Sequence, residues 1–98
     1  MNAPVLEIVE FRASGNSETL HEAASAMEPW LRAQPGFRWR RLAKLDDGTY
    51  LDCIEWTDMG SAKVAADRIM AAAPAANFMA LIDGPSVLIR HASVALSQ

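Results

Sequence analysis

Residues 34–56, QPGFRWRRLAKLDDGTYLDCIEW, are the stretch that decides the fold. Pro35-Gly36 ends the helical segment that precedes it, because proline and glycine are typical helix stop signals. Two β-rich runs follow, residues 37–45 and 49–57. They are joined by Asp46-Asp47-Gly48, a hairpin signal in which the glycine can adopt a positive φ. The centre of the chain is therefore predicted to be a β-hairpin that follows a helix.

The flanking segments complete the pattern on both sides of this hairpin. An apolar run, Val5 to Phe11, precedes a helical stretch that starts near Asn16-Ser17. A second helical stretch starts at Asp58 and ends near Asp83-Gly84-Pro85, and a last apolar run spans Val87 to Val94. This β-α-β-β-α-β order predicts an α+β fold, with two helices on one face of a four-stranded antiparallel sheet. We expect a single ferredoxin-like domain over residues 1–98, with strand order 4-1-3-2.

Two prolines interrupt the helical stretches. Leu20, Ala24, Met27 and Leu31 form one apolar helix stripe, and Pro29 falls inside it. Proline removes a backbone hydrogen bond and clashes with the preceding turn. We therefore expect the first helix to kink or restart near Glu28, and Pro74 to divide the second helical stretch into two pieces.

The side-chain alternation along each strand predicts which face is buried. The first strand carries apolar residues on both faces, which favours a central strand. In the third strand, Tyr50, Asp52, Ile54 and Trp56 share one face. In the second strand, Phe37 and Trp39 are expected on one face and Arg38 and Arg40 on the other. The basic group Arg38, Arg40, Arg41 and Lys44 is therefore interpreted as a solvated strand face.

Composition excludes several classes of function. The formal net charge is −3 and the chain has no long basic block, so nucleic-acid binding is not expected. No apolar run reaches the length of a membrane span, which indicates a cytoplasmic protein without a membrane role. Cys53 is the single cysteine, and with only two histidines the chain has no metal-ligand spacing. We expect Cys53 to be a buried, unreactive thiol.

A homodimer is the predicted assembly. Helices on one side leave the other face of the sheet uncovered, and 51% of the residues are hydrophobic, which is high for a chain of this length. A second copy that packs sheet against sheet would cover this face.

Two motifs carry a resemblance to a known family. Glu28-Pro29-Trp30-Leu31 leads into Gln34-Pro35-Gly36-Phe37, and residues 50–56 end in Trp56 just before the second helical stretch. With the order of elements, these motifs resemble the dimeric α+β barrel superfamily, in particular its antibiotic-biosynthesis-monooxygenase-like members, from Val5 to Val94. That superfamily includes cofactor-independent quinone-forming monooxygenases, haem-degrading enzymes, lactone isomerases and dye-type peroxidases. The fold alone does not choose among these activities.

The resemblance implies site residues on the third strand. Cofactor-independent members carry an asparagine four residues before a tryptophan, and here Asp52 lies four residues before Trp56. The tryptophan matches and the asparagine does not. An amide can donate a hydrogen bond to a ligand oxygen, whereas an ionised carboxylate can only accept one. Haem-degrading members use a histidine on the second helix, which is absent here, so the resemblance implies neither haem nor another cofactor.

A carboxylate and an imidazole are expected to meet across the sheet. In strand order 4-1-3-2, the first and last strands are antiparallel neighbours, so Glu7 should approach the residues from His91 to Val94. Such a pair suits acid–base work, although it can also be a satisfied polar contact. Glu7, Asp52 and His91 are the candidate catalytic residues. Trp56, Tyr50 and Phe78 are the candidates for ligand binding, and each of them can equally be a core residue.

The sequence leaves the function open between two classes. The first is a homodimer that binds a small apolar or aromatic molecule between helices and sheet and resembles cofactor-independent monooxygenases. The alternatives are a non-enzymatic ligand-binding or interaction module, and a lactone-isomerase-like enzyme. The sequence does not identify the ligand, the pathway or a protein partner.

Overall fold

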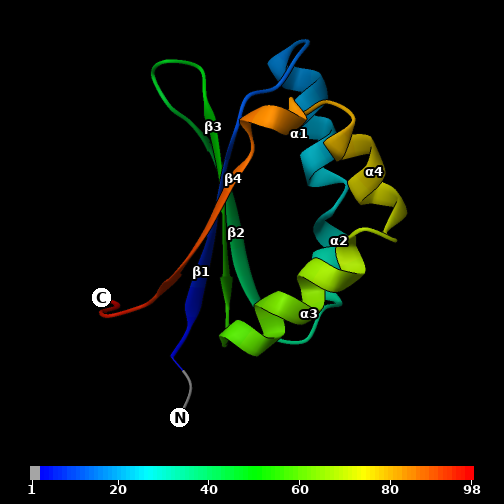
Figure 1. The fold of residues 1–98 in the computed structure, drawn as a ribbon. Helices are drawn as coiled ribbons and strands as arrows, with labels where there is room; N and C mark the ends of the chain where they lie inside the picture. The colour runs from blue at the N-terminus through cyan, green and yellow to red at the C-terminus, as the bar shows by residue number, and fades with distance from the viewer. Residues whose placement is uncertain (1–2) are drawn as a thin grey trace.

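The computed structural model describes residues 3–98 and shows a four-stranded antiparallel sheet with its helices on one face (Figure 1). The strands are β1 (Val5–Phe11), β2 (Phe37–Lys44), β3 (Tyr50–Trp56) and β4 (Leu88–Ser93). The helices are α1 (Ser17–Ser25), α2 (Glu28–Arg32), α3 (Met59–Ile69), α4 (Ala73–Met79) and the short 3-10 helix η1 (Gly84–Ser86). The sheet order is β2-β3-β1-β4, which confirms the predicted ferredoxin-like α+β fold and its strand order.

Both helical stretches are divided as the prolines predict. The first restarts as α2 at Glu28, with Pro29 in its first turn, where a missing N–H removes no helical hydrogen bond. The second restarts as α4, with Pro74 in the same position. Asn16 and Asp58 cap α1 and α3, each accepting a hydrogen bond from a backbone N–H of the first turn. No helix within residues 3–98 is long and apolar enough to cross a membrane.

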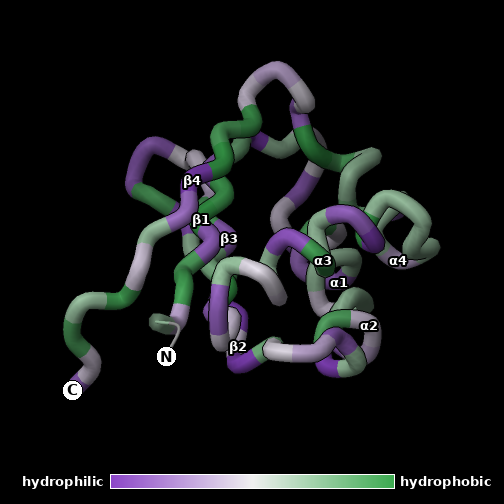
Figure 2. The backbone as a smooth tube through the Cα atoms, turned by 60° about the horizontal axis from the view of Figure 1, so that its bottom comes forward, coloured by the Kyte–Doolittle hydropathy of each residue, from purple (hydrophilic) through white to green (hydrophobic). Residues whose placement is uncertain are grey.

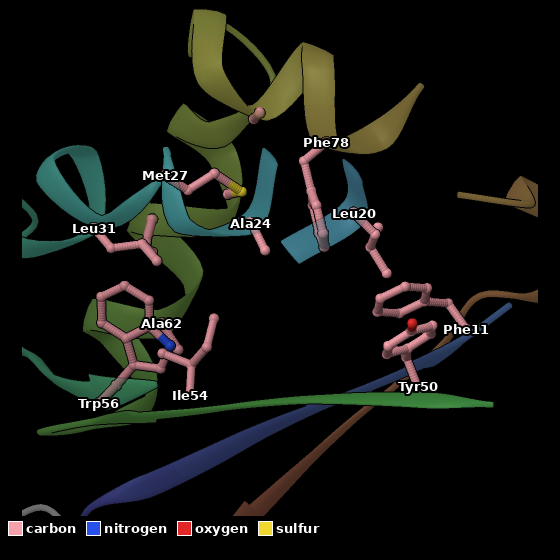
Figure 3. Close-up of a cluster of buried hydrophobic side chains, with 12 residues drawn as sticks. Phe11, Leu20, Ala24, Met27, Leu31, Tyr50, Ile54, Trp56, Ala62 and Phe78 are labelled. Carbon is pink, nitrogen blue, oxygen red and sulfur yellow. The ribbon is translucent and has the colours of Figure 1, made fainter. Parts of the chain in front are cut away.

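The inner face of the sheet, defined as the face covered by the helices, carries the core. All four residues predicted to share one face of β3 are buried: Tyr50, Asp52, Ile54 and Trp56. Figure 3 shows Tyr50, Ile54 and Trp56 pointing from the sheet toward side chains of the helices. Ala62 and Ala65 of α3 are buried in this layer, and their small size lets the helix lie close to the sheet. In Figure 2 hydrophobic and hydrophilic positions alternate along the chain, as expected for elements buried on one side.

The predicted side-chain alternation of β2 is wrong from Trp39 onwards. The pairing with β3 matches Phe37 to Trp56 and Trp39 to Glu55, which are adjacent residues of β3, so a β-bulge lies between Phe37 and Trp39. A bulge adds one residue and sends the following side chains to the other face. Trp39 therefore lies on the outer face, and Arg40, paired with Ile54, lies on the inner one. The basic group is not a uniformly solvated face, because Arg40 is largely buried.

No helix formed by residues 3–98 lies over the outer face of the sheet, the face opposite the helices (Figure 1). Its apolar members include Leu6, Ile8, Leu51 and Cys53, which are half-buried, and Leu88, which is exposed. Two ion pairs also cross this face: Arg38 lies 3.0 Å from Glu55, and Arg90 lies 3.9 Å from Glu10. The outer face thus combines an apolar centre with paired charges.

Candidate functional site

A cavity of about 410 Å³ lies between the inner face and the helices. Its walls come from helices α2, α3 and α4, their connecting segments and the start of β4, and they are almost entirely apolar. They include Met27, Trp30, Leu31, Ala65, Ala66, Ile69, Met70, Phe78, Met79, Val87 and Ile89. The inner face of the sheet forms the floor of the cavity. The polar groups of the lining come from this floor and belong to Glu7, Arg40, Asp52 and Trp56. A mostly apolar pocket with a few convergent polar groups is typical of a small-molecule site.

The strand register places the polar groups of the floor in a row. Arg40 of β2 pairs with Ile54 of β3, which pairs with Glu7 of β1, which pairs with His91 of β4. Directly paired residues of antiparallel strands lie on the same face. The floor therefore has a guanidinium at one side of Ile54 and a carboxyl–imidazole pair at the other.

Glu7 is held by two neighbours. Its Oε1 accepts a hydrogen bond from Nε1 of Trp56 at 3.3 Å and lies 3.9 Å from Nε2 of His91. Burial raises the pKa of the Glu7 carboxyl above its usual value, and the negative charge of Asp52 adds to this. Protonated His91, the Trp56 hydrogen bond and the positive charge of Arg40 oppose the rise. A carboxylate with a raised pKa binds a proton more tightly, which suits a general base or acid.

Asp52 is engaged in a bidentate ion pair. Its Oδ1 accepts from Nε of Arg40 at 2.8 Å and its Oδ2 from Nη2 at 2.7 Å. Arg40 also donates from Nη1 to the carbonyl oxygen of Ala24 at 2.7 Å, near the end of α1. The two side chains are only 11% and 6% exposed. Arg40 thus joins β2, β3 and α1, and the alternation of the sequence did not reveal this role.

The three candidate ligand-binding residues have different surroundings. Trp56 is 1% exposed, which confirms its predicted burial, and its ring packs edge-on against Phe37 at 5.8 Å between centroids. Phe78 lines the cavity and lies under the guanidinium of Arg40. Tyr50 does not line the cavity. It stacks on Phe11 at 5.6 Å and donates a hydrogen bond from its hydroxyl to Ser17 at 3.0 Å.

The structure thus brings four of the six candidates to one cavity and a fifth beside it. Glu7, Asp52, Trp56 and Phe78 line the cavity, and His91 contacts Glu7 from the edge strand β4. His91 is 30% exposed in its side chain, so the imidazole connects the buried carboxyl with solvent.

Two further features lie outside this cavity. A second groove of about 410 Å³ runs between the α1–α2 segment and β2, with a mixed lining whose polar side chains include His21, Glu28 and Arg38. On the outer face, burial and the charges of Asp52 and Glu55 raise the pKa of the Cys53 thiol, which favours the unreactive form. Within residues 3–98, no group of three histidine, cysteine or acidic residues is placed to hold a metal ion.

Comparisons with known proteins identify the fold. No protein family model and no curated protein sequence matches the chain. A variant of SnoaB, a cofactor-independent oxygenase from Streptomyces nogalater, matches with a TM-score of 0.80 at 18% identity, over 97% of this chain and 96% of that chain. A putative antibiotic biosynthesis monooxygenase from Bordetella bronchiseptica matches with a TM-score of 0.79 at 12% identity, over 97% and 100%.

A third solved structure is described as a dimeric ferredoxin-like protein of unknown function. It comes from Jannaschia sp. CCS1 and matches with a TM-score of 0.68 at 14% identity, over 93% of this chain and 99% of that chain. At these identities the likeness concerns the fold. The chain has the ferredoxin-like α+β fold of antibiotic-biosynthesis-monooxygenase-like proteins over nearly its whole length.

Proposed function

We propose that this protein binds a small aromatic molecule in the cavity between helices and sheet, and that Glu7 accepts a proton from it. The observation that carries the proposal is the position of Glu7. Its carboxyl group lies on the floor of a mostly apolar cavity, with the Trp56 indole as hydrogen-bond donor and His91 between it and solvent. An aromatic ligand would pack on the apolar walls and turn its acidic group toward this carboxylate.

The reaction we propose is oxidation of an electron-rich phenol by O₂ without an added cofactor. Glu7 removes the phenolic proton, and the resulting phenolate is the more readily oxidised form. The phenol and O₂ then give a quinone and water: one atom of O₂ becomes the second oxygen of the quinone, and the other atom leaves as water. His91 passes the proton between Glu7 and solvent, Trp56 orients Glu7 and packs beside the ligand, and Phe78 contributes an aromatic wall. The structural likeness to a cofactor-independent oxygenase supports this class of reaction.

Oxygen consumption tests the proposal. Purified protein without added metal or cofactor is mixed with electron-rich phenols and hydroquinones in an oxygen electrode. We expect uptake above the uncatalysed rate, and at least a tenfold loss, about 1.4 kcal/mol of barrier, in Glu7→Gln and in His91→Gln. Arg38→Gln is the matched control, because it removes a charge from the same sheet on the outer face. Equal uptake in all four proteins would refute the proposed site.

A binding module without turnover is the second candidate. The bidentate pair between Arg40 and Asp52 gives it some support, because the pair engages one of the two carboxylates that line the cavity and leaves only Glu7 for proton transfer. Binding of aromatic compounds with quenching of tryptophan fluorescence, without oxygen uptake or product, would support this candidate. A lactone-isomerase-like reaction would instead move a proton within the ligand, with no oxygen consumed.

The proposal includes a homodimer formed by the outer faces of two sheets. Leu6, Ile8, Leu51 and Leu88 give this face an apolar centre that no part of residues 3–98 covers with a helix. A stable interface of this kind would bury at least about 1,000 Å² in total. The dimeric structural neighbour from Jannaschia supports the arrangement. In a sheet-to-sheet dimer the cavities lie on the helix sides, one in each subunit.

A further inference from the structure

Among residues 3–98, Arg40 is the only cationic side chain that lines the cavity, and the bulge in β2 is the reason for its position. Without the bulge, the alternation along β2 would place Arg40 on the outer face, like Arg38. With it, the guanidinium lies beside Asp52 and beneath α1, with two hydrogen bonds to the carboxylate and one to Ala24. A buried charge is costly unless paired, so each member of this pair requires the other.

The pair determines which carboxylate of the floor can act. Asp52 and Glu7 lie on adjacent strands, offset by two positions, because Asp52 pairs with Val9. Both oxygens of Asp52 accept hydrogen bonds from Arg40, whereas Glu7 has a hydrogen-bond partner within residues 3–98 only at Oε1, from Trp56. A proton on Asp52 would remove its negative charge and so weaken both charge-assisted hydrogen bonds to Arg40. Glu7 can accept a proton on Oε2 while keeping the contact with Trp56.

The charge of Arg40 also acts on Glu7. The groups that face Glu7 are Arg40 on β2, Asp52 and Trp56 on β3, and His91 on β4, while the helix residues that line the cavity include no titratable side chain. Asp52 raises the pKa of Glu7 and Arg40 lowers it, both acting after the larger effect of burial. Arg40 therefore offsets the repulsion between two carboxylates that share one floor.

We propose that Arg40 is a positioning residue that binds Asp52 in a neutral pair and thereby leaves Glu7 as the proton acceptor of the cavity. This inference rests on the proposed function, because it concerns which group takes the proton from the bound molecule. It assigns Asp52 an indirect part: the residue fixes Arg40 and shapes the floor, and Glu7 with His91 moves the proton.

The indole N–H of Trp56 provides a readout that needs neither ligand nor activity. Its hydrogen bond to Glu7 makes the ¹H and ¹⁵N shifts of this group sensitive to the charge of that carboxyl. These shifts are followed by NMR as a function of pH in ligand-free wild-type protein, and Glu7→Gln identifies the transition that belongs to Glu7. The same titration is then made for Arg40→Gln, Asp52→Asn, the double variant and Arg40→Lys.

The expected midpoints differ in direction. Arg40→Gln leaves the charge of Asp52 uncompensated and should raise the Glu7 midpoint by about one pH unit. Asp52→Asn leaves the cation uncompensated and should lower it by a similar amount. In the double variant the two effects cancel, so its midpoint should return near the wild-type value. Arg40→Lys keeps the charge and should stay within about 0.3 units, and Arg38→Gln, on the outer face, should leave the midpoint unchanged.

Several outcomes would overturn the inference. A midpoint that is the same in all folded variants would show that Arg40 only stabilises the fold. If Arg40→Gln does not fold, Asp52→Asn and the double variant still test the inference. The Glu7 midpoint should be lower in Asp52→Asn than in the double variant, and equal midpoints would refute the role of Arg40. Failure of the proposed function is recognised separately: shifted midpoints without oxygen uptake leave the role of Arg40 intact and remove the oxidation. Oxygen uptake that depends on Glu7, combined with midpoints that do not shift in the variants, would support the oxidation and refute the role of Arg40.

Discussion

The Nε1–H group of Trp56, the last residue of β3, donates a hydrogen bond to Oε1 of Glu7, near the middle of β1, at 3.3 Å. The strand pairing places Trp56 opposite Val5, so the indole reaches diagonally along the floor to the carboxyl group. The buried ring thereby satisfies its single donor and holds the carboxyl group in place at the same time. The position of Glu7, the proposed base, therefore depends on Trp56, a residue of the core.

The first prediction concerns the packing of Trp56. Trp56→Ala removes a fully buried ring beside Phe37 and should lower the free energy of unfolding by about 3–5 kcal/mol. Denaturant unfolding followed by circular dichroism measures this. Trp56→Phe keeps an aromatic ring and loses the donor to Glu7, so its loss should be clearly smaller. A midpoint of Trp56→Ala equal to that of the wild type would contradict the burial of this residue.

The second prediction concerns the pH dependence of stability. The folded protein raises the pKa of Glu7 above its unfolded value, so it favours the protonated form. The contribution of Glu7 is then fully present below the unfolded pKa, near 4.5, and is lost as the pH rises through the folded pKa. Glu7→Gln cannot ionise and should lack this loss. The free energy of unfolding of Glu7→Gln minus that of wild type should therefore be larger at pH 7 than at pH 4.

The comparison can be made by denaturant unfolding at a series of pH values. Glu18→Gln, on the first turn of α1, is a control for the general effect of removing one acid. If the difference between wild type and Glu7→Gln is the same at pH 4 and pH 7, Glu7 does not have a raised pKa in the folded state.

The third prediction concerns the dimer. A charge on the outer face, as in Leu51→Glu, should dissociate the subunits, because this carboxylate would lie opposite Glu10 and be buried in an apolar interface, which is costly. Light scattering should give twice the 10.7 kDa chain mass for the wild type and the chain mass for the variant. Val64→Glu, at an exposed position of α3, should remain dimeric. A wild-type mass equal to one chain at micromolar concentration would exclude the proposed assembly.

The fourth prediction separates two causes of glycine preference. Gly36 and Gly48 both have positive φ, +85° and +91°. A Cβ at Gly48 would meet nothing within 4 Å, so Gly48→Ala should cost only the left-handed backbone strain, about 1–2 kcal/mol. A Cβ at Gly36 would also run into the side chains of Ser61 and Thr57, at the start of α3. Gly36→Ala should therefore destabilise the protein more than Gly48→Ala in the same unfolding experiment, and equal losses would mean that this contact relaxes freely.

The pattern of the sequence determined the architecture. Helix stops at Pro35-Gly36 and near Pro85, the hairpin at Gly48, the apolar run of β1 and the period of two in β3 are local signals, and each depends on a few neighbouring residues. The strand order, which followed from the order of elements, predicted Glu7 near residues 91–94, and the register of the structure places it opposite His91. The alternation in β3 placed Trp56 on the buried face, and the missing N–H of proline predicted the breaks at Pro29 and Pro74.

Only the tertiary structure decided which side chains form the floor of the cavity. Alternation predicts a face only along an uninterrupted ladder, and the bulge after Phe37 reversed the faces for the rest of β2. Nothing local marks this bulge. Arg40 is stable on the inner face because Asp52, twelve residues away, and the end of α1 supply its partners. Tyr50 stays out of the cavity because Phe11 and Ser17 engage it. These contacts join segments far apart in the chain, so their energies decide an arrangement that local patterns do not encode.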